Sequence, residues 1–231
     1  MTVTAKILSY DAGELTLLVT EPISRELIRQ QVDTVEIRLQ DGREITAEQR
    51  RAIFATISDI SLWSGHDPQY LRDHLSWDFC KKCDEDPFSL SDCSVTLAHD
   101  FLDYLIDFCL RWDVPVKESL ANRTDDIGRY MYHCIEHSKC AVCGQPGEVH
   151  HVDTVGANGG SRQRISHIGL RAVCLCRTHH AEAHTHESKF FAAHHIEPIK
   201  LDKYLCDIHN LPTEAKRRIP QAAVILPEPA N

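Results

Sequence analysis

The chain has 231 residues, enough for one large or two small domains that each bury a hydrophobic core. Its net charge is −9 and 42% of its residues are hydrophobic, both ordinary values for a soluble globular protein. No apolar run is long enough to span a bilayer and the first residues do not have the form of a signal peptide, so we expect neither a membrane protein nor a secreted one.

Strands dominate the predicted structure of the first forty residues. Residues 3–10 and 14–20 have the composition of strands, and the turn residues 11–13 between them favour a hairpin. A short helix is expected over residues 24–31, and residues 34–39 alternate as a half-buried strand would.

Helices are predicted next. Thr46 is a candidate N-cap, with Gln49 three residues further on as in a capping box, and apolar residues then recur at helical spacing as far as Trp63. Asp67 and Pro68 are typical of the start of a second helix.

A third, longer helix is predicted after an N-cap at Ser91 or Asp92. Residues 115–123 have the composition of a linker. Thr124 or Asp125 is then expected to cap a further helix that leads into a region rich in cysteine and histidine.

Four residues in two short pairs have the spacing of a closed tetrahedral zinc site. A Cys-x2-Cys pair comprises Cys140 and Cys143, and a Cys-x2-His pair comprises Cys176 and His179. Four protein ligands leave no open coordination position, so a structural role is expected. The alternative is a set of unrelated buried thiols, which two correctly spaced pairs disfavour. Thiolates that bind zinc also indicate a reducing, cytoplasmic location.

A second set of ligands consists of histidines. His180 and His184 lie one turn apart on the same face of a predicted helix, and His150 from a distant strand can complete a group of three. Three ligands and an open position are typical of a catalytic metal ion. Adjacent residues of a strand point to opposite faces, so His151 is left for another role, such as that of a general base.

This stretch resembles the HNH nucleases, whose ββα-metal fold consists of a two-stranded hairpin and a helix around one divalent ion. The resemblance covers roughly residues 134–205 and includes a zinc knuckle. It implies that His151 is the general base and that three histidines hold the catalytic ion: His150, His180 and His184.

The middle residue of the family motif is usually Asn, and here the chain departs from the pattern. Two residues are candidates, His167 and Asn158. We favour His167 because it precedes the second predicted strand of the hairpin, residues 170–175. A zinc-only module with a cluster of surface histidines remains the alternative for the whole region.

Phosphate contacts are expected from arginines between and beside the metal ligands. Residues 151–231 hold 10 Lys/Arg and 8 Asp/Glu, so residues 1–150 carry a net charge of −11. The candidates for DNA contact in the less acidic part are Arg162, Arg164, Arg171 and Arg177. Ordinary solvated arginines are an equally good interpretation of any one of them.

Residues 1–118 resemble, more faintly, the Orf (NinB) family of phage recombination mediators. The resemblance rests on the order of the predicted strands, the helix that opens at residues 45–49, and residues 88–93 before the long helix. It implies binding to single-stranded DNA or to single-strand-binding protein, and formation of a homodimer. The acidic charge of this part favours a protein partner over direct contact with DNA.

The prediction is therefore an α+β protein with an Orf/NinB-like α+β domain (1–118), a ββα-metal HNH domain (119–212) and a disordered tail (213–231). The predicted function is that of a phage-type, metal-dependent DNA endonuclease acting in recombination or DNA processing in the host cytoplasm. Structural Zn²⁺ and a second ion, Mg²⁺, Mn²⁺, Ni²⁺ or Zn²⁺, are the expected cofactors. The alternative is a non-catalytic recombination mediator that binds single-stranded or branched DNA and uses zinc only to hold its fold.

Overall fold

The computed structural model describes residues 5–19, 42–153 and 165–214, which belong to two compact units, residues 1–41 and 42–231. In the first unit, β1 (Ala5–Asp11) and β2 (Glu14–Val19) pair in antiparallel fashion, which confirms the predicted hairpin. The helix expected over 24–31, the strand over 34–39 and the tail beyond residue 214 lie outside the described residues.

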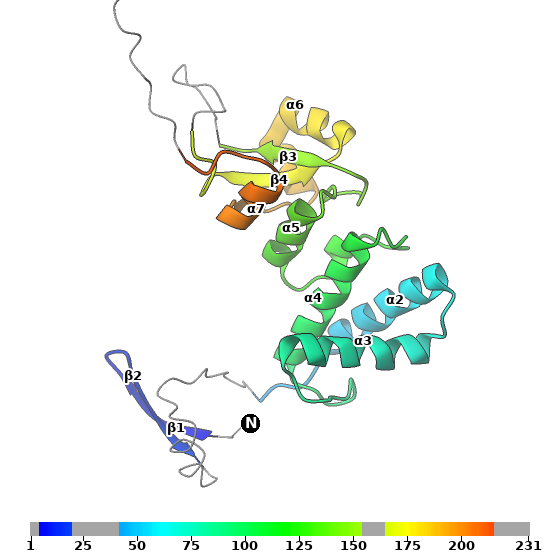
Figure 1. The fold of residues 1–231 in the computed structure, drawn as a ribbon, viewed down its shortest axis with the longest axis vertical. Coiled ribbons are helices and arrows are strands. Elements are labelled where there is room, and N and C mark those ends of the chain that lie inside the picture. The colour runs from blue at the N-terminus through cyan, green and yellow to red at the C-terminus, as the bar shows by residue number, and fades with distance from the viewer. Residues whose placement is uncertain (1–4, 20–41, 154–164, 215–231) are drawn as a thin grey trace, which may run out of the picture. The chain divides into compact units, whose positions relative to one another are not determined.

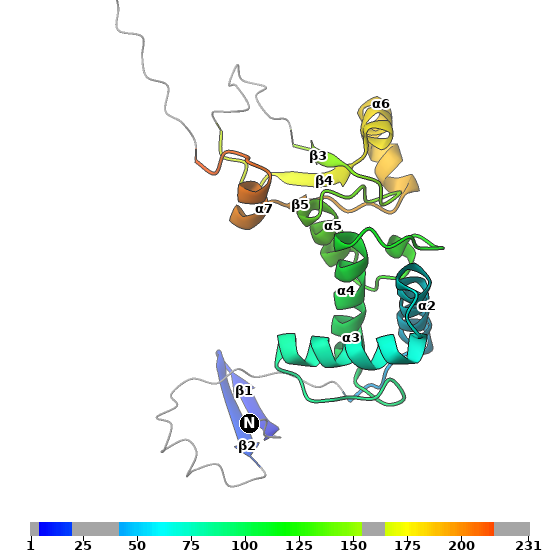
Figure 2. The ribbon, with the colours of Figure 1, turned by 45° about the vertical axis from the view of Figure 1, so that its right-hand side comes forward.

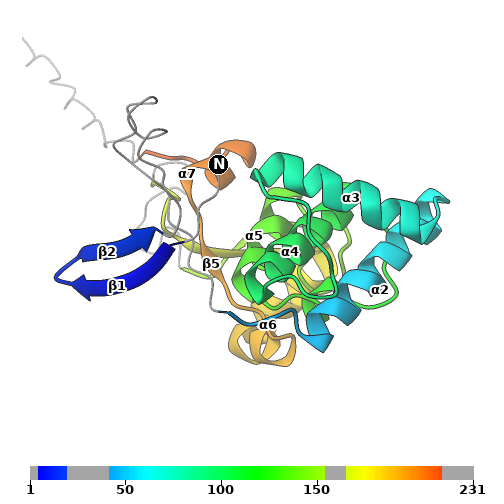
Figure 3. The same cartoon turned by 90° about the horizontal axis from the view of Figure 1, so that it is seen from below.

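Three helices open the second unit (Figures 1 and 3). They are α2 (Ala47–Ser64), α3 (Pro68–Cys83) and α4 (Val95–Arg111), with α4 packed against both of the others. The predicted capping box of α2 is present, since the Thr46 hydroxyl accepts from the Gln49 backbone N–H and the Gln49 side chain accepts from Thr46 N–H, both at 3.1 Å. Asp67 caps α3 as predicted.

Two helix starts differ from the prediction by a few residues. Helix α4 is capped by Ser94, whose hydroxyl accepts from Leu97 N–H at 3.1 Å, and not by Ser91 or Asp92. Helix α5 (Ile127–Glu136) is capped by Asp126, and not by Thr124 or Asp125. In both segments several neighbouring side chains are good caps, so composition alone does not choose among them.

The remaining elements form a small sheet with helices on both sides (Figures 1 and 2). Strands β3 (Glu148–His151), β4 (Arg171–Leu175) and β5 (Ile199–Lys200) pair in antiparallel fashion in the order β3-β4-β5. Helix α6 (Arg177–Ala193) lies on one side, and α5 and α7 (Lys203–Ile208) on the other. Because β4 is covered on both faces, the four residues from Ala172 to Leu175 are all completely buried.

The residues expected to form a linker are packed into this unit. The short 3-10 helix η1 (Leu120–Asn122) buries Leu120, and the guanidinium of Arg123 forms a buried ion pair with Asp59 of α2 at 2.7 Å. One cluster of buried residues extends from Ile45 to Cys206 across the boundary expected at residue 118. The helices and small antiparallel sheets confirm the α+β class.

Among the residues that the structure describes, no helix is both long and apolar enough to cross a membrane.

The ion pair between Arg123 and Asp59 predicts a large loss of stability for Asp59→Ala. The side chains are 5% and 2% exposed, so the substitution leaves a buried charge without a partner. We expect the free energy of unfolding to fall by about 3–5 kcal/mol in urea denaturation. The control is Asp73→Ala, which removes an exposed ion pair with Arg72 and is expected to cost about 0–1 kcal/mol. Equal losses in the two variants would contradict the importance of the buried pair.

Candidate metal centres

The Cys/His quartet lies where α5 leads into the sheet and β4 leads into α6. Cys140 and Cys143 flank a tight turn closed by Gly144 N–H donating to Cys140 C=O at 2.8 Å. Cys176 is the N-cap residue of α6, and His179 follows in its first turn. The two segments are far apart in sequence and meet because residues Glu148–His151 pair with β4.

The distances within the quartet suit one tetrahedral ion. His179 Nδ1 lies 3.3 Å from the sulfur atoms of both Cys140 and Cys176, and the sulfur atoms of Cys143 and Cys176 are 3.7 Å apart. Zinc–sulfur and zinc–nitrogen bonds of tetrahedral sites place neighbouring ligand atoms about 3.5–3.8 Å apart. The four residues can therefore close around zinc with little movement.

The start of α6 also favours the thiolate form of Cys176. Burial opposes ionisation, but the backbone N–H groups of His179 and Thr178 and the neighbouring thiols lower the pKa of Cys176 below its usual value. Thiolate is the form that binds metal, and a helix N-terminus stabilises it.

The second group joins His150 of β3 to two histidines of α6. Ring centroids of His150 lie 4.7 Å from His180 and 4.8 Å from His184, and one nitrogen of each ring lies within 4.8 Å of the others. Because His179 and His180 are consecutive on a helix, they point about 100° apart. The same turn of α6 therefore serves both groups.

Two glutamates orient these rings. Glu148 Oε1 lies 2.6 Å from His180 Nδ1, and Glu187 Oε1 lies 2.9 Å from His150 Nε2. Both carboxylates accept from the ring nitrogen that they contact, which directs the other nitrogen of each ring towards a possible ion. Glu187 follows a break in α6, where His186 adopts φ −150° and ψ 64°.

The environment of His150 Nδ1 shows whether a cation fits between the three histidines. The side chain of His150 is 1% exposed, and its Nδ1 has no hydrogen-bond partner among the described residues. An unsatisfied buried nitrogen is costly, and coordination to an ion would satisfy it. The pKa of His150 also lies below its usual value, because burial and the adjacent His180 and His184 outweigh the hydrogen bond to Glu187. Neutral imidazole is the form that binds metal.

The next residue of β3, His151, faces away from this group and meets His167. His151 Nε2 and His167 Nδ1 are 2.9 Å apart, and the two rings are nearly perpendicular. His167 is 3% exposed, and its backbone N–H donates to Pro212 C=O at 2.7 Å, which fixes the loop that carries it. The geometry thus brings His167 to His151, whereas Asn158 lies outside the described residues.

The four predicted DNA-contacting arginines are placed unequally. Arg171 is exposed, and its guanidinium and backbone N–H both donate to Asp153 at 2.6–3.0 Å. Arg177 is exposed in the first turn of α6. Arg162 and Arg164 lie outside the described residues. A phosphate contact by Arg171 would therefore have to compete with Asp153.

Gly147 allows the two strands that carry these ligands to approach closely. A Cβ atom at this position would lie 2.9 Å from the Cys174 sulfur and 2.9 Å from the backbone of Leu175. Only glycine fits without a shift of the backbone, since a Cβ atom essentially never lies that close to a non-bonded heavy atom. The close approach allows β3, which carries His150 and His151, to pair with β4 in the observed register.

Glu148 and Glu187 are not among the residues predicted from the sequence, although two patterns point to them. Glu148 lies two residues before His150, so both side chains are on one face of the strand. Glu187 follows His184 by three residues, a spacing that in an unbroken helix places two side chains side by side. In the structure α6 breaks at His186, and Glu187 contacts His150. Acidic residues at these offsets from a histidine ligand are candidates for orienting the ligand ring.

The quartet predicts that Cys143→Ala removes one equivalent of zinc per chain. The remaining three ligands bind zinc more weakly, and the junction of β4 and α6 loses its clamp. Elemental analysis by mass spectrometry and thermal unfolding measure both effects. The control is Cys83→Ala, which replaces another exposed cysteine that belongs to none of the metal-ligand groups found among the described residues. Unchanged zinc content in Cys143→Ala would contradict the site.

Comparison with known proteins gives one match. The family model described as "Putative HNHc nuclease" matches residues 18–210, which includes every element of the second unit and both metal-ligand groups. Neither the search of curated proteins nor that of solved structures found a match. Since the family model spans most of the 231 residues, the chain belongs to this family of HNH nucleases.

Proposed function

We propose that this HNH nuclease is a metal-dependent endonuclease that hydrolyses phosphodiester bonds of DNA. The observation that carries the proposal is the arrangement at the end of β3. His150 faces His180 and His184, while His151 faces His167 on the other side of the same strand. This arrangement supports a base and a metal-binding group that would act next to each other on one strand.

In the proposed reaction, His151 accepts a proton from the water that attacks phosphorus. Histidine is the side chain that most often acts as a general base, and His167 holds the His151 ring through the 2.9 Å contact. A divalent ion bound by His150, His180 and His184 would polarise the phosphate and stabilise the charge that develops on the leaving 3′-oxygen. Glu148 and Glu187 keep two of the ligand rings in position.

Contact with DNA is proposed for the arginines around this group. Arg177 projects from the first turn of α6, close in sequence to His180, and Arg171 lies at the start of β4. Together with Arg162 and Arg164 they would bind phosphates on either side of the cut. The lower acidity of residues 151–231, with a net charge of +2, is consistent with this role.

The narrower parts of the proposal rest on sequence resemblance. We propose zinc for the Cys/His quartet, a phage-type role in recombination, and an Orf/NinB-like function of residues 1–118 in homodimer formation or contact with single-strand-binding protein. A cytoplasmic location is supported by the ten cysteines, none of which forms a disulfide. The second candidate function is a mediator that binds DNA without cutting it, which the quartet alone would also support.

We expect His151→Ala to lose DNA cleavage while keeping its metal content. Removal of a general base typically costs 10²–10⁴-fold in rate, so plasmid nicking in Mg²⁺, Mn²⁺ or Ni²⁺ should fall by about that factor. The control is His74→Ala, an exposed histidine of α3 outside every metal-ligand group found in the described part of the chain, and it should cut DNA at the rate of the parent protein.

The same assay separates the two candidate functions. If the parent protein leaves DNA uncut in every metal, the endonuclease proposal is wrong and the mediator is favoured.

The contact between His167 and His151 predicts different effects for two substitutions at residue 167. His167→Asn can still hydrogen-bond to the His151 ring and should retain most of the activity, whereas His167→Ala leaves the ring without this partner. We expect kcat for plasmid cleavage to fall about tenfold or more in His167→Ala, with the pH profile displaced and KM little changed. Equal activity of the two variants would show that the contact does not position His151.

A further inference from the structure

A third group of metal-ligating side chains lies where α4 packs against α5. One ligand comes from α4 and three from the last turn of α5 and its C-cap, and no described residue of the first two groups takes part. One ligand atom of each side chain lies within 4.8 Å of all the others: Asp107, His133, Glu136 and His137.

We propose that this group binds a first-row divalent ion of the zinc class and thereby joins α4 to α5. Two imidazoles and two carboxylates form a ligand set that suits zinc and its neighbours, and not the all-oxygen set that calcium or magnesium prefers. The ion would join the helical part of the unit to the helix that carries the chain into the sheet. It would be distinct from the ions of the Cys/His quartet and of the nuclease site.

The spacing on α5 presents three ligands on one face. His133, Glu136 and His137 are separated by three and four residues, which places them together on a helix surface. Asp107 comes from the facing helix, as its 2.6 Å contact with His137 Nε2 shows. A ligand set drawn from two packed helices resembles the way metal sites are built in helix bundles.

The distances are close to those of a tetrahedral site, in which neighbouring ligand atoms lie about 3.3–3.4 Å apart. His133 Nδ1 lies 3.2 Å from Glu136 Oε2 and 3.6 Å from Asp107 Oδ1, and His137 Nε2 lies 3.7 Å from Glu136 Oε2. The shorter contact, 2.6 Å between His137 Nε2 and Asp107 Oδ1, is a hydrogen bond that an ion would replace.

The outward-facing atoms of three ligands are already held. His133 uses its other nitrogen, Nε2, to donate to Asp103 Oδ2 at 3.2 Å. Asp107 Oδ2 accepts from Arg111 at 3.1 Å, and Glu136 Oε1 accepts from the Tyr204 hydroxyl at 3.0 Å. This is the arrangement that orients ligands in metalloproteins: one atom of each side chain is tied from outside and the other faces the centre.

Burial and charge also favour a cation at this position. Between 12% and 18% of each of the four side chains is exposed, so two carboxylates share a site with little water around them. The C-terminal end of α5, which carries three of the ligands, has a negative partial charge that favours a positive ion. Beside the group, Asp103 Oδ1 is buried and has no hydrogen-bond partner among the described residues.

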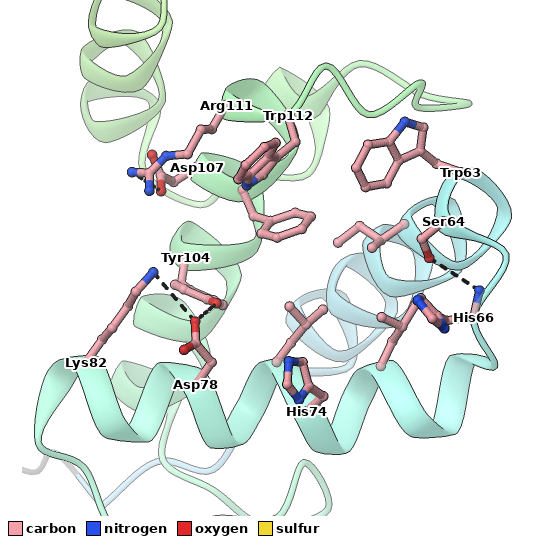
Figure 4. A pocket seen from close by; sticks show the side chains of 14 residues that line it. Trp63, Ser64, His66, His74, Asp78, Lys82, Tyr104, Asp107, Arg111 and Trp112 are labelled. Atoms are coloured by element: carbon pink, nitrogen blue, oxygen red, sulfur yellow. Dashed lines mark hydrogen bonds and ion pairs between the residues drawn. The ribbon is translucent and has the colours of Figure 1, made fainter.

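Asp107 and Arg111 also line a cleft between α2, α3 and α4, whose volume is about 460 Å³. Figure 4 shows both side chains at one end of this cleft. Of the four proposed ligands, Asp107 is the one that forms part of the wall of this cleft.

The competing interpretation is a network of hydrogen bonds without a metal, in which protonated His133 and His137 neutralise the carboxylates. The two interpretations differ in measurable ways. A hydrogen-bond network is indifferent to added zinc, whereas a metal site binds one further equivalent and loses it when its ligands are replaced.

The test compares metal content in the full-length chain after equilibration with zinc and removal of free metal. The double variant His133→Gln/His137→Gln is expected to hold one zinc equivalent less than the parent protein. His99→Gln, which replaces an α4 histidine that pairs with Asp125 and belongs to none of the three ligand groups, should lose none. With Co²⁺ in place of zinc, the lost equivalent should remove d–d absorption without reducing the thiolate charge-transfer band. Equal zinc content in parent and double variant would overturn the proposal.

A second pair of variants avoids any effect of the ligand substitutions on folding. Tyr204→Phe removes only the hydroxyl that holds Glu136, and this side chain is 51% exposed. We expect the affinity for the third zinc to fall about tenfold. The matched control is Tyr132→Phe, whose hydroxyl donates to Asp202, also at 3.0 Å, and it should leave that affinity unchanged. Equal zinc affinities for the two variants would overturn the proposal.

Discussion

Both metal-ligand groups of the nuclease part depend on the junction between β4 and α6. Cys176 follows the last residue of β4 and is the N-cap of α6, so its sulfur joins the quartet at the point where the chain changes direction. The next turn supplies His179 to the quartet and His180 to the three-histidine group. Since β4 is buried on both faces, this junction has little freedom to move, and the two groups share one rigid support.

A site residue can be predicted from the sequence where its partners lie a few residues away, and much less readily where they are distant in the chain. The Cys-x2-Cys and Cys-x2-His pairs and the His180–His184 pair are identifiable as candidate ligands from short spacings, because such spacings have few other physical causes. His150 has no such local signal, since it comes from a distant strand. The same is true of His167: it reaches His151 because its loop is held by Pro212, a contact between residues far apart in sequence. The short elements β5 and α7 carry too few residues for a periodic pattern, so the sequence does not predict them.

The helices α2 to α4 and the region from α5 to α7 share one hydrophobic core, although the composition of the residues between them predicts a linker. Residues 115–123 have the polar character of a linker, yet Leu120 and Arg123 are buried against the helical part, and one core continues into the sheet. The matched family model likewise runs through this region without a break. A division near residue 118 stays a prediction about origin and function, since the contacts place the division between units at residues 41 and 42.

The close approach at Gly147 has a consequence for how sequence change would affect this protein. Position 147 carries no ligand, base or phosphate contact, yet a methyl group there would collide with the Leu175 backbone and push β3 outward. Such a shift would carry both histidines of β3 away from their partners at once. The absence of a side chain at Gly147 therefore determines how closely His150 of β3 approaches the histidines of α6.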